Sequence, residues 1–140
     1  MNSYVWKEHF KFEDWRVAFE YLIPGGYMFK FDISSAYHHI DIHSSHQTFL
    51  GFSWEGKFYV FSVLPFGLTS APFVWTKCLR SVVKFVRENG IYLVLFLDDG
   101  WGVNRSFSLT EENAKFVKDV LQNAGFLINL TRKMNTNANA

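Results

Sequence analysis

The stretch IYLVLFLDDGWG, residues Ile91–Gly102, contains the features that decide the fold of this chain. Its apolar part, Ile91–Leu97, has the length and branching of a buried strand and is far too short to cross a bilayer. Two carboxylates, Asp98 and Asp99, follow directly, and Gly100 falls where we expect a tight turn. The residues after Gly100 would return as an antiparallel strand. The stretch therefore predicts a hairpin whose first strand ends on two adjacent negative charges.

Composition limits the class of protein. The chain has 140 residues, of which 49% are hydrophobic, so we expect one core and a single domain or a piece of one. The net charge of +1 excludes a global electrostatic signature of nucleic-acid or membrane binding. The lone cysteine, Cys78, excludes an internal disulfide framework and fits a reducing compartment. Since no basic and apolar leader opens the chain, we expect an intracellular protein of the cytoplasm or nucleus, neither secreted nor in a membrane.

The remaining elements are predicted from apolar periodicity and from turn and cap residues. In chain order they are a helix behind the cap Asp14 (Trp15, Ala18, Phe19, Leu22), a strand at Tyr27–Phe31, a helical turn within Ser34–Ile40, strands at Thr48–Trp54 and Lys57–Val63 around Glu55-Gly56, helices at Ala71–Glu88 and Ser108–Ala124, and a strand at Phe126–Leu130. Ser108 and Glu111 form a capping-box pattern at the start of the last helix. This order predicts an α+β domain with helices packed on one face of a mainly antiparallel sheet.

The helix predicted at Ala71–Glu88 has two distinct faces. Its apolar stripe consists of Val74, Cys78, Leu79, Val82 and Val86. Its basic residues recur at steps of 3, 4 and 3, at Lys77, Arg80, Lys84 and Arg87. The apolar stripe already accounts for the helix, so we interpret the basic face as its solvated side rather than as a template-binding surface.

A third carboxylate, Asp32, follows the strand predicted at Tyr27–Phe31. If this strand neighbours Ile91–Leu97 in the sheet, their ends could bring three carboxylates together. Carboxylates so close repel each other unless a hard dication holds them, and two Mg²⁺ ions about 3.5–4 Å apart are typical of phosphoryl transfer. The alternative is that Asp98-Asp99 lies in an ordinary solvated turn. The carboxylates alone thus raise the hypothesis of a metal site without deciding it.

Three motifs in order resemble those of one known family. FKFDISSAYHHI at Phe29–Ile40 looks like the first catalytic motif of retroelement reverse transcriptases. LPFGLTSAP at Leu64–Pro72 resembles the second, and FLDD at Phe96–Asp99 is similar to the aromatic-x-Asp-Asp box. The resemblance extends over about Phe12–Lys133, and Gly100–Gly102 looks more like the DIRS-like elements than like retroviruses. The chain therefore resembles the palm domain of a truncated reverse transcriptase of the LTR or DIRS-like retrotransposon type.

The resemblance implies a fold and a chemistry. The fold would be a polymerase palm with an antiparallel ferredoxin- or RRM-like sheet, and the activity would be RNA-directed DNA polymerase. Asp32 and Asp98 would hold two Mg²⁺ ions, or Mn²⁺ in their place, together with the backbone carbonyl of Ile33. Asp99 would lie beside the ions and add negative charge to the metal site. A primer 3′-hydroxyl would attack the α-phosphate of an incoming deoxynucleotide and release pyrophosphate.

The resemblance also implies residues that touch the substrate. Tyr37 would be a steric gate under the sugar of the nucleotide, and its alternative reading is a core tyrosine packed on the sheet. Phe66 and Gly67 of the second motif would lie at the substrate, where the glycine lets the backbone approach the template-primer or nascent base pair.

The end of the chain resembles the fourth palm motif at Gly125–Asn129. A nearby basic residue would protonate the departing pyrophosphate, and both Arg132 and Lys133 stand at this position. Arginine is a poor general acid because it hardly gives up its proton, which favours Lys133. The chain also has four histidines close together, which raise the alternative of a zinc site: His38, His39, His43 and His46. Their spacing does not match that of a known closed zinc site.

The resemblance finally divides the chain and implies its partners. Residues 1–134 would form a partial reverse transcriptase domain, mainly palm, and 135–140 a polar tail. The fingers would lie mostly upstream, and the thumb and an RNase H region downstream, in a larger polyprotein. The partners would be an RNA or DNA template with its primer, and deoxynucleotides. The alternative is a catalytically inactive palm remnant that binds nucleic acid or protein, or has no function.

Overall fold

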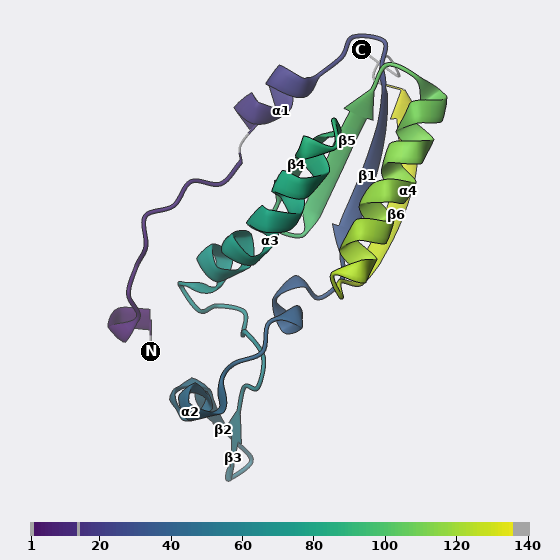
Figure 1. Cartoon of the computed structure of the whole chain (residues 1–140). Coiled ribbons are helices and arrows are strands. Elements are labelled where there is room, and N and C mark those ends of the chain that lie inside the picture. The colour runs from purple at the N-terminus through teal and green to yellow at the C-terminus, as the bar shows by residue number, and fades with distance from the viewer. Residues whose placement is uncertain (1, 14, 136–140) are drawn as a thin grey trace.

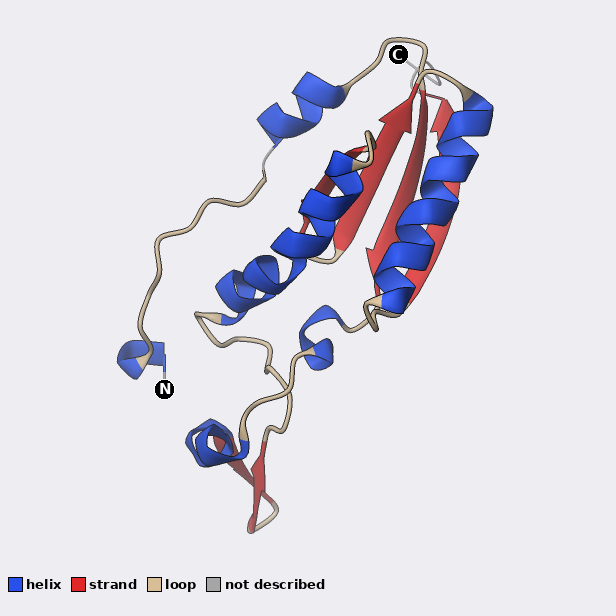
Figure 2. Ribbon diagram, viewed as in Figure 1, coloured by secondary structure: helices blue, strands red, loops and turns tan. Residues whose placement is uncertain are grey.

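The computed structural model describes residues 2–13 and 15–135, and the side chains of all of these except Trp15 and residues 130–135. Figure 1 and Figure 2 show the elements and their arrangement. In chain order the elements are η1 (Asn2–Tyr4), α1 (Trp15–Tyr21), β1 (Tyr27–Ile33), η2 (Ala36–His39), α2 (Ser44–Gln47), η3 (Thr48–Leu50), β2 (Gly51–Trp54), β3 (Lys57–Val60), α3 (Ala71–Glu88), β4 (Tyr92–Phe96), β5 (Asp99–Asn104), α4 (Phe107–Asn123) and β6 (Ile128–Asn135).

The main sheet has four strands in the order β4-β5-β1-β6, and every neighbouring pair is antiparallel. Figure 2 shows α3 and α4 lying side by side on one face of this sheet. The structure therefore confirms the predicted α+β class with helices on one face of an antiparallel sheet. It also shows that β1 and β4 are not neighbours, because β5, the return strand of the hairpin, lies between them. None of the helices in the described part of the chain is long and apolar enough to cross a membrane.

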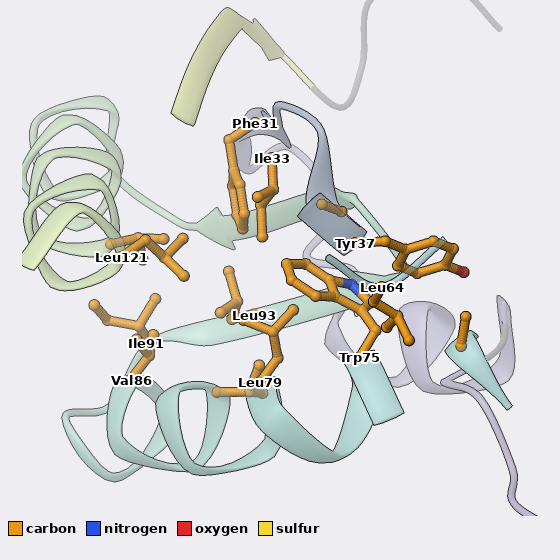
Figure 3. Packing of buried hydrophobic residues seen from close by; sticks show 14 of the residues in the cluster. Phe31, Ile33, Tyr37, Leu64, Trp75, Leu79, Val86, Ile91, Leu93 and Leu121 are labelled. Carbon is orange, nitrogen blue, oxygen red and sulfur yellow. The ribbon is translucent and has the colours of Figure 1, made fainter. Parts of the chain in front are cut away.

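Strand β1 separates a buried face from an open one because alternate side chains of a strand point to opposite sides. Phe29, Phe31 and Ile33 are each 1% exposed and belong to the core. Figure 3 shows Phe31 and Ile33 above Leu93, with side chains of α3 below. The intervening residues, Lys30 and Asp32, must then lie on the face away from this core. The alternation of the strand thus places the first predicted carboxylate on the open face of the sheet.

The turn between β4 and β5 differs from the prediction. Leu97 and Asp98 form it, and Leu97 has a φ of 55°. Gly100 lies inside β5, where an added Cβ would be 2.1 Å from the Cζ atom of Phe31. The expectation that Gly100 makes the turn is therefore wrong. This glycine is needed because the Phe31 ring on the neighbouring strand occupies the space of its side chain.

The second hairpin follows the prediction more closely. Glu55 and Gly56 join β2 to β3 with φ values of 49° and 74°, as a two-residue turn of the I′ type requires. The strands are shorter than expected, since η3 occupies Thr48–Leu50 and β3 ends at Val60. These two strands form a separate sheet, which projects away from the main one at the bottom of Figure 1.

The bounds predicted for α3 are confirmed, but its buried face is partly different. The residues that face the core are Ala71, Trp75, Leu79, Val83 and Val86. Of the predicted stripe, Leu79 and Val86 are buried and the half-buried Val74 and Val82 pack against the core, whereas Cys78 is exposed, so the prediction is wrong at Cys78 alone. The buried residues recur at steps of four and three, which is the helical period, so Cys78, one position before Leu79, points away from the core.

The remaining elements confirm their predicted type with shifted ends. Helix α4 begins at Phe107 behind the N-cap Ser106, and the Ser108 hydroxyl contacts Glu112, so the capping-box prediction is wrong. Strand β6 begins at Ile128, two residues later than expected, and continues to Asn135. Helix α1 forms at Trp15–Tyr21, so the predicted Leu22 lies just beyond it, and Phe19 of the predicted apolar face is exposed. Its predicted cap, Asp14, lies outside the described residues.

Candidate active site

The three predicted aspartates lie at one end of the main sheet. Asp32 and Asp99 are directly opposite each other in the β1–β5 ladder. Such opposite residues have Cβ atoms about 4.5–5.5 Å apart. Asp98 is adjacent in the turn, and its backbone carbonyl accepts a hydrogen bond of 2.9 Å from the N–H of Ile33. The ladder thus brings together acidic residues that are 66 positions apart in the chain, counted from Asp32 to Asp98.

A lysine that the sequence analysis missed balances this acidic end. The Nζ atom of Lys30 lies 2.9 Å from Oδ1 of Asp99, and both side chains are about half exposed. The hydrogen bond and charge of Asp99 raise the pKa of Lys30, and the charges of Asp32 and Asp98 raise it further. The position of Lys30 two residues before Asp32 could have identified it, because residues i and i+2 of a strand share a face.

The donor chemistry of this end suits a hard dication. Carboxylate and carbonyl oxygens are the ligands that Mg²⁺ prefers, and the ammonium of Lys30 shows that the acidic side chains attract a cation. Within residues 2–13 and 15–135, however, no three His, Cys, Asp or Glu side chains are grouped closely enough to hold a metal ion by themselves. The Ile33 side chain is buried in the core, so only its backbone could contribute a ligand. The residues therefore fit a magnesium site that takes further ligands from water and substrate.

Tyr37 lies between the core and this acidic end. Its side chain is only 8% exposed, and its ring packs 4.8 Å from Phe66 and 6.2 Å from Trp75. Burial raises the pKa of Tyr37, and the charge of Asp98 raises it further. The burial agrees with the reading of a core tyrosine, while the influence of Asp98 is what a residue next to the site would show. Both readings therefore remain compatible with its position.

The loop of the second motif is open on the side of its glycine. Gly67 has a φ of 84°, a conformation that favours glycine, and an added Cβ would meet no atom within 4 Å. The preceding Phe66 is 65% exposed. The loop is held by Asn2, whose side-chain amide donates to the Gly67 carbonyl at 2.8 Å and accepts from the Thr69 N–H at 3.0 Å. The space next to Gly67 leaves room for a ligand to approach the backbone.

The candidate general acid is not placed by the structure. The side chains of Arg132 and Lys133 lie outside the described ones, although both residues belong to strand β6. Two of the histidines accept hydrogen bonds from backbone N–H groups. His39 accepts a hydrogen bond of 3.1 Å from the Leu127 N–H, and His43 accepts one of 3.3 Å from Ser45 at the start of α2.

The basic face of α3 is engaged in local contacts. Arg87 forms an ion pair with Glu13 at 2.6 Å and donates to the backbone carbonyl of Leu93. Lys84 lies 3.7 Å from Glu88. Lys84 thus lies in solvent as interpreted, whereas Arg87 is half-buried against Glu13 and β4.

Comparisons with known proteins identify the family and the fold of the chain. The family model described as "Reverse transcriptase (RNA-dependent DNA polymerase)" matches residues 10–136. The Tf2-3 and Tf2-4 transposon polyproteins of Schizosaccharomyces pombe are 32% identical over 111 residues, which is 76% of this chain and 8% of each polyprotein. The chain therefore spans less than a tenth of the length of these relatives.

Two solved structures of the foamy viral protease-reverse transcriptase show the same fold. The complex with double-stranded DNA has a TM-score of 0.80 at 21% identity and covers 91% of this chain and 22% of that one. The complex with an RNA/DNA hybrid also has a TM-score of 0.80 at 21% identity and covers 96% of this chain and 18% of the other. At this level of identity the likeness concerns the fold.

Proposed function

Because the chain belongs to the reverse transcriptase family, we propose that it provides the catalytic palm of a retrotransposon RNA-directed DNA polymerase. The observation that carries this proposal is the pairing of Asp32 with Asp99 in the β1–β5 ladder. Asp98 lies next to this pair, and its backbone carbonyl accepts a hydrogen bond from the N–H of Ile33. All three acidic residues of the predicted site thus come from one end of a rigid sheet. This arrangement gives no support to the alternative of an inactive remnant, for which a lost or displaced aspartate would be expected.

The acidic end would bind the metal ions of the reaction. Asp32 and Asp98, with the backbone carbonyl of Ile33, would hold two Mg²⁺ ions, or Mn²⁺ in their place. Such ions, when bound, stabilise the negative charge that develops on the attacking and leaving oxygens. Asp99 would add negative charge next to them and keep Lys30 in place through their ion pair. The β1–β5 ladder holds these residues in fixed register, which supports alignment as the main source of acceleration.

The substrates would be a template with its primer and deoxynucleotides. Tyr37 would lie under the nucleotide sugar, where a ribose 2′-hydroxyl would clash with its ring. The Tyr37 ring packs against Phe66 and Trp75, which supports this role, because a ring that excludes ribose must be held in place when the 2′-hydroxyl meets it. Gly67 and Phe66 would contact the substrate from the open loop, and Lys133 would be the general acid. The fingers, thumb and RNase H regions would be supplied by the rest of a polyprotein such as those of the relatives, with residues 1–134 as the palm part.

Primer extension tests this function. The chain is incubated with a primed homopolymer RNA template, deoxynucleotides and Mg²⁺, and compared with Asp98→Asn and with the control Asp119→Asn, whose aspartate is exposed on α4. We expect extension by the wild type and the control and a loss of about a hundredfold or more in Asp98→Asn, because charge neutralisation of the transition state depends on this carboxylate. The proposal would be refuted for the chain alone if it extends no primer while a version joined to fingers and thumb does.

A further inference from the structure

The turn that carries Asp98 is held by two hydrogen bonds from different elements. The N–H of Ile33 in β1 donates to the carbonyl of Asp98 at 2.9 Å. The indole N–H of Trp75 in α3 donates to the carbonyl of Leu97, also at 2.9 Å. Leu97 itself has a φ of 55°, which is unfavourable for a residue with a side chain. The turn therefore depends on outside contacts to keep its shape.

Close packing holds this turn on one side only, where the half-buried Leu97 side chain packs against the core. Asp98 and Asp99 are exposed. Leu97 also borders a cavity of about 580 Å³ between α3, β4 and the segment that carries Lys11. Because packing encloses the turn on the Leu97 side only, directional hydrogen bonds have more influence on where Asp98 lies. Of the two, the one from Trp75 is made by a side chain and can be removed by substitution.

Trp75 itself is held firmly. Its side chain is fully buried, and its ring packs edge-on against Phe126 at 5.6 Å and Tyr37 at 6.2 Å. Figure 3 shows the ring pointing from α3 toward the sheet, next to Tyr37. A donor on so rigid a ring defines the position of its acceptor. The same ring contacts the tyrosine that the proposed function places under the nucleotide sugar.

We propose that Trp75 is a positioning residue, which sets the place of the Asp98 carboxylate relative to Asp32 through its hydrogen bond to the Leu97 carbonyl. The proposal rests on the proposed function for what Asp98 does, but its structural part stands on the bond itself. A phenylalanine at this position would fill most of the same space, but it has no N–H to donate to the Leu97 carbonyl and so would not hold the turn. The contact of Trp75 with Tyr37 further links the metal end of the site to its nucleotide end.

The test removes the indole N–H of Trp75, in one variant with the size and shape of the double ring retained. In the intact chain, Trp75 is replaced by benzothienylalanine, in which sulfur stands in place of the indole N–H, and in a second variant by Phe (Trp75→Phe). The matched control is the same pair of replacements at Trp54, which is 65% exposed on the β2–β3 hairpin. Amide hydrogen exchange and backbone chemical shifts are measured at residues 97–100, and the Mn²⁺ dissociation constant is measured by electron paramagnetic resonance.

We expect faster exchange at residues 97–100 and a Mn²⁺ dissociation constant raised about five- to tenfold in both Trp75 variants, which corresponds to the loss of one hydrogen bond. The Trp54 variants should change neither quantity. Unchanged shifts and exchange in the benzothienylalanine variant would overturn the proposal, as would an equal rise over all of β4 and β5, which indicates a ring that only fills the core. If the wild type binds no Mn²⁺, the proposed metal site fails, while exchange at the turn still decides the role of Trp75.

Discussion

The main sheet and the β2–β3 hairpin both contain aromatic strands, but they differ in how far these strands are buried. Both contain several aromatic residues, and both are antiparallel. In β1, the alternate residues Phe29, Phe31 and Ile33 are buried, whereas every residue of β2 and β3 is exposed. Phe58 in β3 is 88% exposed, and Phe31 is 1% exposed. Strand formation thus follows local sequence in both regions, but burial depends on what the strand meets.

The difference has a simple geometric cause. Strand β1 is paired on both edges, by β5 and β6, and lies against α4, whereas β2 and β3 pair only with each other. A two-stranded hairpin gains little stability by itself in water. What supports it here is the I′ turn at Glu55-Gly56 and cross-strand stacking of Phe52 on Tyr59, with ring centroids 5.3 Å apart. Only the sheet is rigid enough to place the aspartates.

The largest expected contrast is between aromatic residues of the two regions. We predict that Phe31→Ala lowers the free energy of unfolding by about 3–5 kcal/mol, since it removes a fully buried ring and leaves a cavity. The matched change Phe58→Ala should cost less than about 0.5 kcal/mol, because the ring is already in water. Urea unfolding followed by circular dichroism measures both. Similar losses in the two variants would mean that the hairpin is as well packed as the sheet.

Two glycines provide the next contrast. Gly100→Ala should cost about 3 kcal/mol, because the new Cβ would overlap the Phe31 ring. Gly56→Ala should cost only about 1 kcal/mol, since it meets a positive φ of 74° but open space. Unfolding midpoints in urea check the order. Combining Gly100→Ala with Phe31→Leu should cost less than the sum of the single changes, and strict additivity would contradict the proposed contact.

The edge strand β4 of the main sheet is held by a charged side chain, a contact that can be compared with an exposed ion pair on α3. On the edge strand β4, the Glu13 carboxylate accepts a hydrogen bond from the Leu95 N–H at 3.1 Å and pairs with Arg87. Glu13→Gln should therefore destabilise the chain by about 1–2 kcal/mol, because it weakens a partly buried charged contact. The control Glu88→Gln affects an exposed pair with Lys84 and should cost at most about 0.5 kcal/mol. Equal effects in chemical denaturation would show that Glu13 does not protect the edge.

The smallest effect concerns alkaline pH. The pKa of Tyr37 is raised above 10.0, mainly by burial, so the unfolded chain loses this proton before the folded chain does. The native state then binds more protons above pH 10, and the free energy of unfolding falls as the pH rises through the folded pKa. The raised pKa of Lys30 acts in the same direction above 10.5. Tyr37→Phe should reduce the loss of stability between pH 9 and pH 11, and an unchanged slope would place the effect elsewhere.

Local signals predicted much of the secondary structure. The bounds of α3 and the turn at Glu55-Gly56 were correct, because periodicity and turn residues act within a few neighbours along the chain. The predicted cap of α4, Ser108, was wrong, because Ser106 suits a helix start equally well and is the N-cap in the structure. Lys30 was missed although its position two residues before Asp32 predicts a shared face, but its ion pair with the sequence-distant Asp99 required the tertiary structure.

The sequence by itself determined that the chain has aspartates at the ends of two strands, in motifs that resemble those of reverse transcriptases. Only the tertiary structure decided how they meet: β5 lies between β1 and β4, so that Asp32 faces Asp99 rather than the end of β4. It also decided that Gly100 makes room for Phe31 and that Trp75 holds the Leu97 carbonyl. These contacts join residues far apart in the chain, and no local pattern specifies which strand or helix will lie beside another.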